Sequence, residues 1–152
     1  MSIKGTITLP GDKSLSHRAL IFAAMSNGES QILNLSNGSD VISTRDCLEH
    51  CGIEIFDNGH TTFIRGGEFT DPIVDLNCGN SGTTTRLLLG LLAGKGINAR
   101  FVGDQSLSSR PMDRILNPLA QMGLRLKSND GKLPISIFKS DFQAQNLSWT
   151  YN

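Results

Sequence analysis

The sequence predicts an α/β fold of the α+β kind, built from helices and strands that recur in the same order. Stretches with apolar residues at helical spacing alternate with short β-prone stretches. Glycine or Asx-Gly turns separate these stretches. Arg18 and Gly52 have counterparts in Arg86 and Gly123, roughly 70 residues further on. These observations indicate a duplicated unit of helix, strand, helix, strand and strand, with a strand entering each first helix.

The first expected helix covers residues 14–26. Its Leu15, Ala19, Phe22 and Ala23 form an apolar stripe at helical spacing, which we expect to pack on the core. Three further helices are expected, over residues 40–51, 81–93 and 111–122. In the last of them Pro111 lies near the first position, where its missing N–H is harmless.

Short β-prone runs predict the strands. They cover residues 3–9, 31–35, 53–56, 61–65, 98–102, 124–127 and 134–138. Two of the connections, Asp57-Asn58-Gly59 and Asn129-Asp130-Gly131, have the composition of hairpin turns. A strand-like run at residues 147–151 would begin a third unit, so we expect the chain to be truncated there.

Composition excludes several classes of protein. The chain has 152 residues, 38% of them hydrophobic and 18% charged, which fits one domain with a buried core. Lysine and arginine total 14, as do aspartate and glutamate, so no net field attracts nucleic acid or an anionic membrane. No stretch resembles a signal peptide or is long enough to span a bilayer, and we expect a cytoplasmic protein.

Three cysteines, an odd number, argue against a disulfide framework. Cys47 and Cys51 have a spacing that can chelate a metal, but no further His or Cys pair accompanies them. The alternative, small buried residues on one helix side, fits their neighbours Val41, Thr44 and Leu48. We predict no metal and no cofactor.

A first polar cluster, residues 11–18, begins the first helix. Unpaired N–H groups at a helix start attract anions, and here Lys13 adds a charge and Ser14 a hydroxyl. Arg18 follows one turn later on the same side. The alternative is an ordinary capped helix with a solvated basic residue. A nucleotide P-loop is excluded because its glycine-lysine spacing is absent.

Two further clusters repeat this chemistry. Residues 79–86 combine glycines, which allow close approach of a ligand, with a run of hydroxyls. In residues 106–114, Arg110 precedes Pro111 and offers a planar guanidinium. The alternatives are a capped helix with a threonine-rich first turn and a surface ion pair. Taken together, the three clusters predict a shared surface for anionic ligands.

The segments that overlap the three polar clusters resemble the signatures of a known family. Residues 9–19, 79–86 and 109–123 are similar to three signatures of the 5-enolpyruvylshikimate-3-phosphate synthase (EPSP synthase) family, in the same order and separation. The resemblance runs through nearly the whole chain but covers only about the first third of a full-length enzyme. We therefore expect an N-terminal fragment.

The resemblance implies a reaction and a set of site residues. The family transfers the enolpyruvyl group of phosphoenolpyruvate to the 5-hydroxyl of shikimate 3-phosphate and releases phosphate. This is the step before chorismate in aromatic amino-acid biosynthesis, and glyphosate blocks it. Lys13, Ser14 and Arg18 would bind shikimate 3-phosphate. Phosphoenolpyruvate would be bound by Lys13, Gly82 and Arg110, with Asn80, Thr83 and Arg86 nearby. Lys13 would also be catalytic, by stabilising charge as phosphate leaves.

The family fold is an inside-out α/β barrel of βαβαββ units. By this resemblance, residues 1–11 would be a strand belonging to the other domain, and residues 12–152 a partial first domain with its third unit truncated. The acid/base residues would lie beyond Asn152, so the isolated chain should be inactive; the full-length enzyme should be a monomer.

The sequence departs from the family pattern at two positions, and two alternative identifications are considered. Leu87 stands where many relatives have proline, which leaves glyphosate sensitivity open although Gly82 is kept, and Ser109 stands where a basic residue is common. UDP-N-acetylglucosamine enolpyruvyl transferase is a rival, but it has Lys-Asn in place of Lys13-Ser14 and a loop cysteine absent from residues 103–112. The other rival is a non-catalytic phosphate-binding module complete at this length.

Overall fold

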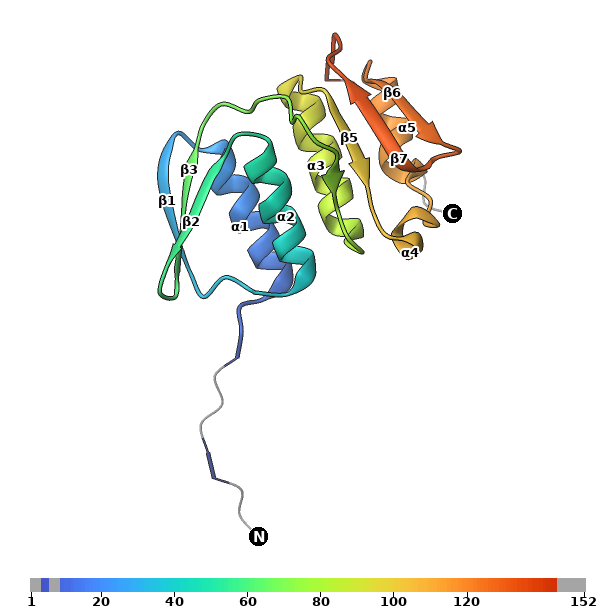
Figure 1. The fold of residues 1–152 in the computed structure, drawn as a ribbon. Coiled ribbons are helices and arrows are strands. Elements are labelled where there is room, and N and C mark those ends of the chain that lie inside the picture. The colour runs from blue at the N-terminus through green and yellow to red at the C-terminus, as the bar shows by residue number, and fades with distance from the viewer. Residues whose placement is uncertain (1–3, 6–8, 145–152) are drawn as a thin grey trace.

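A computed structural model describes residues 4–5 and 9–144 and has a mixed α/β architecture (Figure 1). The helices are α1 (Lys13–Met25), α2 (Ser39–His50), α3 (Gly82–Lys95), α4 (Gln105–Ser108) and α5 (Asp113–Gln121). The strands are β1 (Gly28–Leu33), β2 (Glu54–Asn58), β3 (Thr61–Gly66), β4 (Leu76–Asn77), β5 (Ala99–Val102), β6 (Arg125–Asn129) and β7 (Lys132–Phe138). The strand expected at 147–151, and most of that expected at 3–9, lie outside the described residues.

Two sheets enclose a layer of helices. The strands of the first sheet follow the order β1-β3-β2, all antiparallel, and those of the second follow β4-β5-β7-β6, in which only β4 and β5 are parallel. Helices α1, α2 and α3 lie side by side between the sheets, and all three begin at the same end of the molecule (Figure 1). This arrangement brings residues far apart in sequence to one end of the helix layer.

The two predicted hairpins are confirmed, and each has a two-residue turn. Asn129 pairs with Lys132, so Asp130 and Gly131 form the turn, and both have positive φ (51° and 69°), as a type I′ turn requires. In the first hairpin Asn58 pairs with Thr61. The turn residues are therefore Gly59 and His60, one position later than expected.

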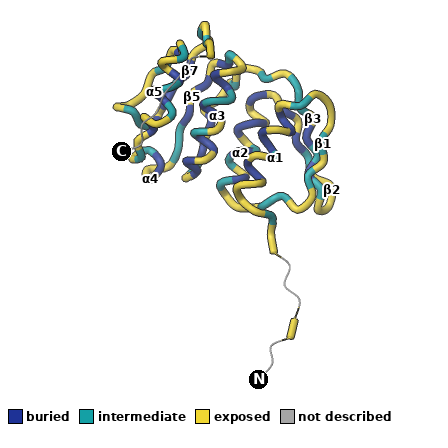
Figure 2. Tube along the Cα trace, turned by 180° about the vertical axis from the view of Figure 1, so that it is seen from behind, coloured by how far each residue is buried: buried dark blue, intermediate teal, exposed yellow. Residues whose placement is uncertain are grey.

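The prediction that Leu15 and Phe22 pack on the core is wrong. Their side chains are 61% and 65% exposed, and Ala19 is only half-buried. The buried side of α1 consists of Ser16, His17, Leu20, Ile21, Ala23 and Ala24. This side packs on α2 and β3. Polar residues can lie there because the Ser16 hydroxyl accepts from the Ser36 N–H at 3.0 Å and His17 bonds to Thr44. The burial pattern can be followed in Figure 2.

The helix expected at 111–122 begins later, and the short helix α4 was not expected. The Asp104 carboxylate accepts from the Leu107 N–H at 2.7 Å and caps α4. α5 begins only at Asp113, after Met112, so Pro111 precedes the helix instead of occupying its first turn. As a result, Arg110 lies in the link between two helices.

Apolar side chains from the helices and both sheets form one contiguous core. Cys47 and Cys51 belong to it, each only 1% exposed, together with Val41 and Leu48, which confirms the interpretation of this segment as a buried helix side. Burial raises the pKa of the Cys51 thiol to about 12. In the described part of the chain, no helix is long and apolar enough to cross a membrane.

Candidate functional site

The starts of α1 and α3 carry the residues expected from the sequence. Lys13 is the first residue of α1, and Ser14 and Arg18 follow it with exposed side chains. Gly82 is the first residue of α3, preceded by Asn80 and Ser81. Both helix starts lie at the same end of the helix layer, on either side of α2 (Figure 1).

At the α1 start, two carboxylates modify the expected cation site. The Lys13 ammonium forms an ion pair with Asp40, the second residue of α2. Lys13 remains about half exposed (56%), so a stronger anion can compete for it. Asp12 caps the helix by accepting from the Leu15 N–H at 2.7 Å, so one of the free N–H groups is already occupied. Ligand binding at this start therefore depends on side chains as well as on the helix end.

At the α3 start, two arginines converge on Gly82. A Cβ added to Gly82 would lie 2.6 Å from Nη1 of Arg86 and 3.7 Å from Nη1 of Arg110. Within residues 4–5 and 9–144, neither guanidinium lies within 4.0 Å of a carboxylate oxygen. Two cations without carboxylate partners, next to the positive end of a 14-residue helix, create a local field for an anion.

Arg110 is held in place by neutral oxygens. Its Nη2 donates to Asn80 Oδ1 at 2.6 Å and to Ser106 Oγ at 3.2 Å, and its Nη1 donates to the Asn80 carbonyl at 3.4 Å. Asn80 is itself oriented, because its amide donates to Asp104 at 2.7 Å. Hydrogen bonds from the Leu107 N–H and from Asn80 hold the pKa of the Asp104 carboxyl below its ordinary value. The guanidinium is therefore oriented by neutral groups, and its charge acts on the nearby Asp104 carboxylate without direct ion-pair contact.

The hydroxyl run after Gly82 divides into an outer and an inner part. Thr83 is exposed and remains available to a ligand. Thr84 and Thr85 are fully buried and bond within the fold, so the expectation that the whole run offers donors to a ligand is wrong. The cause is that successive helix residues point in directions about 100° apart, so only one of the three threonines points outward.

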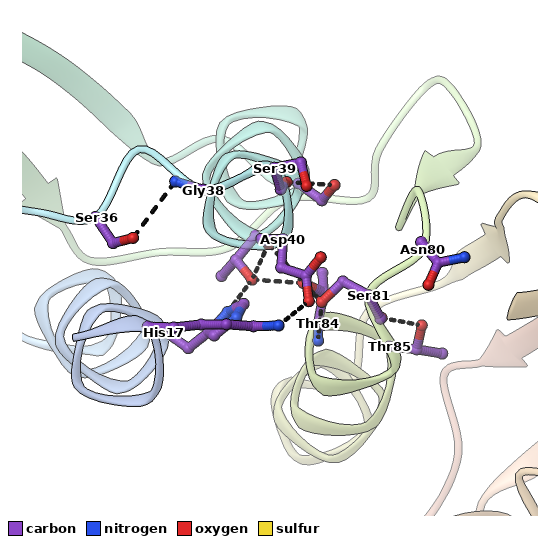
Figure 3. A network of polar contacts seen from close by, with 12 residues as sticks. His17, Ser36, Gly38, Ser39, Asp40, Asn80, Ser81, Thr84 and Thr85 are labelled. Atoms are coloured by element: carbon purple, nitrogen blue, oxygen red, sulfur yellow. Dashed lines mark hydrogen bonds and ion pairs between the residues drawn. The ribbon is translucent and has the colours of Figure 1, made fainter. Parts of the chain in front are cut away.

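Asp40 and His17 are the site residues that sequence reasoning missed. The Asp40 carboxylate forms an ion pair with Lys13. The backbone carbonyl of Asp40 accepts a hydrogen bond from Thr84 Oγ1 at 3.1 Å (Figure 3). His17 is 1% exposed, and its Nδ1 lies 2.7 Å from Thr44 Oγ1. Asp40 begins the second expected helix, but nothing in the sequence pairs it with Lys13, 27 residues earlier. No sequence signal identified the partner of His17.

Stability is expected to fall as the pH decreases from 7.5 to 5.5. Burial lowers the pKa of His17 below its ordinary value of 6.5, outweighing the opposing effect of Asp40, while Lys13 lowers it further. The unfolded chain therefore takes up a proton first, and the free energy of unfolding decreases by up to about 1.4 kcal/mol per pH unit below about pH 6.5. Urea unfolding at pH 7.5, 6.5 and 5.5 measures this slope. His17→Gln should flatten it, and an equal slope in both proteins would assign the effect to other groups.

A hollow of about 450 Å³ is lined by Asn34, Arg45, Asp57 and Thr62, and its edge reaches Pro10, before α1, and Val41, which follows Asp40. Arg45 donates to Asp57 at 2.5 Å, and Asp57 also accepts from Thr62 at 2.7 Å. The Arg45 guanidinium beside Asp57 lowers the pKa of that carboxyl. Because Asp57 already neutralises the charge of Arg45, the hollow is a weaker candidate for an anion-binding site than the α3 start.

The family model, the similar sequences and the similar solved structures all belong to one family. Residues 1–150 match the family model described as EPSP synthase (3-phosphoshikimate 1-carboxyvinyltransferase). The 3-phosphoshikimate 1-carboxyvinyltransferase of Solibacter usitatus is 47% identical over 137 residues, covering 88% of this chain and 32% of that protein. That of Oenococcus oeni is 47% identical over 139 residues, covering 89% and 32%. A solved structure of EPSP synthase from Acinetobacter baumannii has a TM-score of 0.82 and 36% identity, covering 88% of this chain and 32% of that one. The chain thus spans about a third of the length of the proteins it matches.

Proposed function

The chain belongs to the EPSP synthase family, and we propose that it supplies one wall of a two-substrate site for shikimate 3-phosphate and phosphoenolpyruvate. The reaction of the whole enzyme would be transfer of the enolpyruvyl group to the 5-hydroxyl of shikimate 3-phosphate, with release of phosphate. The chain spans about a third of the length of the relatives it matches, and we expect it by itself to bind substrate without turning it over.

The observation that carries this proposal is the convergence of Arg86 and Arg110 on Gly82 at the start of α3. Both substrates are multiply anionic, and preorganised cationic and backbone donors are what such substrates require. Gly82 has no side chain, and it is buried with the Arg86 guanidinium against it. A phosphate or carboxylate group would reach the helix N–H groups as Arg86 turns toward it. Arg86, Arg110, Asn80 and Thr83 would surround phosphoenolpyruvate.

The start of α1 would bind the other substrate. Lys13, Ser14 and Arg18 are exposed and would hold shikimate 3-phosphate. α1, which begins at Lys13, starts at the same end of the helix layer as α3 (Figure 1). By the family pattern, Lys13 would contact both substrates. It would leave its ion pair with Asp40 on binding, and it would stabilise the charge that develops as phosphate leaves.

We also propose that the chain is a portion of an inside-out α/β barrel. The order helix, strand, helix, strand, strand occurs twice, as α1-β1-α2-β2-β3 and as α3-β5-α5-β6-β7, with α4 inserted in the second. This recurrence, with β4 entering α3, supports a repeated βαβαββ unit within residues 12–152. Residues 1–11 would belong to the other domain.

Calorimetric titration of this chain with shikimate 3-phosphate, against inorganic phosphate, tests the proposal. We expect shikimate 3-phosphate to bind at least about tenfold more tightly than phosphate, since only the former offers ring hydroxyls to additional donors. Lys13→Met should weaken both ligands. Equal affinities would favour a generic phosphate-binding module. Mixing both substrates should release no phosphate above background, and clear turnover would contradict the expectation that this chain alone is inactive.

A further inference from the structure

A chain of buried side-chain hydrogen bonds joins the N-terminal halves of the three helices (Figure 3). His17 Nδ1 on α1 lies 2.7 Å from Thr44 Oγ1 on α2, and that oxygen lies 2.7 Å from Thr84 Oγ1 on α3. Thr84 Oγ1 then lies 2.7 Å from Ser81 Oγ, the cap of α3. All four side chains are at most 1% exposed. We define these four residues as the cross-helix chain.

Both ends of the cross-helix chain adjoin the proposed binding residues. His17 lies one helical turn from Lys13 and directly precedes Arg18. Ser81 lies between Asn80 and Gly82 and also accepts from the Thr84 N–H at 3.1 Å. Any shift of α1 against α3 would therefore have to break at least one bond of this chain.

The number of available hydroxyl protons favours one donor direction along the cross-helix chain. Thr84 has one hydroxyl proton, and two acceptors lie beside it: the Asp40 carbonyl at 3.1 Å and Ser81 Oγ at 2.7 Å. If Thr84 donates to either of them, the Thr44–Thr84 bond must use the Thr44 proton. Thr44 then cannot donate to His17, so His17 Nδ1 carries a hydrogen and donates to Thr44.

The remaining nitrogen of His17 agrees with this assignment. Its Nε2 is buried and has no hydrogen-bond partner among the described residues. In the opposite arrangement, Thr44 would donate to Nδ1, and Nε2 would be a buried N–H without an acceptor. Unpaired buried N–H groups are rarer in proteins than incompletely satisfied acceptors, so the neutral Nδ1–H form is favoured.

We propose that His17 and Thr44 are positioning residues, which hold the α1 and α3 starts in the relative placement that two-substrate binding requires. This inference rests on the proposed function. The cross-helix chain touches neither substrate directly; it acts through the helices that carry Lys13 and Gly82. Bonds in a buried chain strengthen one another, and a partly satisfied chain is costly, so such a chain favours one arrangement of the helices.

Two substitutions at Thr44 separate positioning from packing. Thr44→Val keeps the side-chain volume but removes the hydroxyl, whereas Thr44→Ser keeps the hydroxyl and removes a methyl. We expect Thr44→Val to weaken shikimate 3-phosphate binding by about tenfold, as for one lost buried hydrogen bond, and Thr44→Ser to stay within about threefold of the parent. Ser43→Ala is the control for loss of an α2 hydroxyl outside the cross-helix chain, because among the described residues the Ser43 hydroxyl bonds to the Ser39 carbonyl, at 3.1 Å. If packing alone matters, the valine variant will bind better than the serine variant, which overturns the proposal.

Measurements on the ligand-free chain test the inference independently of substrate binding. Nitrogen NMR at pH 7.5 should find His17 neutral with its hydrogen on Nδ1; a hydrogen on Nε2 would overturn the proposed direction. Thr44→Val should shift the amide signals of residues 80–83, on the far side of α2, and Thr44→Ser should leave them nearly unchanged. Equal shifts in both variants would contradict the positioning role. If the parent chain fails to bind shikimate 3-phosphate, the proposed function fails, and these spectra still decide whether the chain aligns the helices.

Discussion

Replacing Arg110 by alanine is expected to weaken phosphoenolpyruvate binding to this chain by about 30- to 150-fold, corresponding to about 2–3 kcal/mol. Arg110 is pre-oriented by Asn80 and Ser106, so the substitution removes a charged donor that needs no reordering before it binds. The Asn80 amide oxygen would also lose its partner. Arg110→Lys should recover only part of the affinity, because a lysine lacks the planar fork that reaches Asn80 and a ligand together. Calorimetry at low ionic strength measures both effects.

Arg114→Ala is the matched control for Arg110. Arg114 is exposed, lies four residues further on in α5 and changes the net charge by the same amount. Its substitution should alter the affinity for phosphoenolpyruvate by less than about threefold, since it changes only the long-range electrostatic attraction. Equal losses in both variants would show that the chain attracts the ligand by general charge. No detectable binding by the parent would contradict the α3 start as a phosphoenolpyruvate site.

Replacing Phe101 by alanine is expected to lower the free energy of unfolding by about 3–5 kcal/mol. Phe101 is fully buried in β5 and lies between Leu76 on β4 and Ile135 on β7, both also fully buried. The neighbours belong to two strands of one sheet and cannot collapse into the space left by the ring without breaking their pairing. Since whole domains are stable by only about 5–15 kcal/mol, a substantial unfolded population is expected on warming. Urea unfolding followed by circular dichroism provides the measurement.

Phe22→Ala is the control for the loss of a phenyl ring. Phe22 is 65% exposed on α1, so its removal should change stability by no more than about 0.5 kcal/mol. The comparison also tests which side of α1 is buried. A loss similar to that of Phe101→Ala would mean that Phe22 packs against the core, as the hydrophobic spacing alone suggested.

Local patterns in the sequence predicted most of the secondary structure. Gly52 and Gly123 follow the ends of α2 and α5 with φ of 91° and 94°, a backbone conformation that glycine adopts without strain. The turn residues Asp130 and Gly131 likewise determined a hairpin at the expected place. These features depend on residues close together in the chain, so they could be read without any knowledge of the fold.

The candidate site was predicted as a set of residues but not as an arrangement. The sequence indicates Lys13 and Arg110 because a cation at a helix start can bind an anion, whatever the surroundings. The partners Asp40 and Asn80 come from segments 27 and 30 residues away from them, and short-range spacing says nothing about such pairs.

The sequence by itself determined the order of helices and strands, the turns and the chemical character of the helix starts, because these follow from neighbouring residues. Tertiary structure decided that His17 is buried while Phe22 is exposed, since a buried polar group is tolerated only where another element supplies its partner. It also decided that Arg86 and Arg110 meet over Gly82. Their convergence depends on the packing of α3 against the segment that follows β5, and no pattern within either segment contains that information.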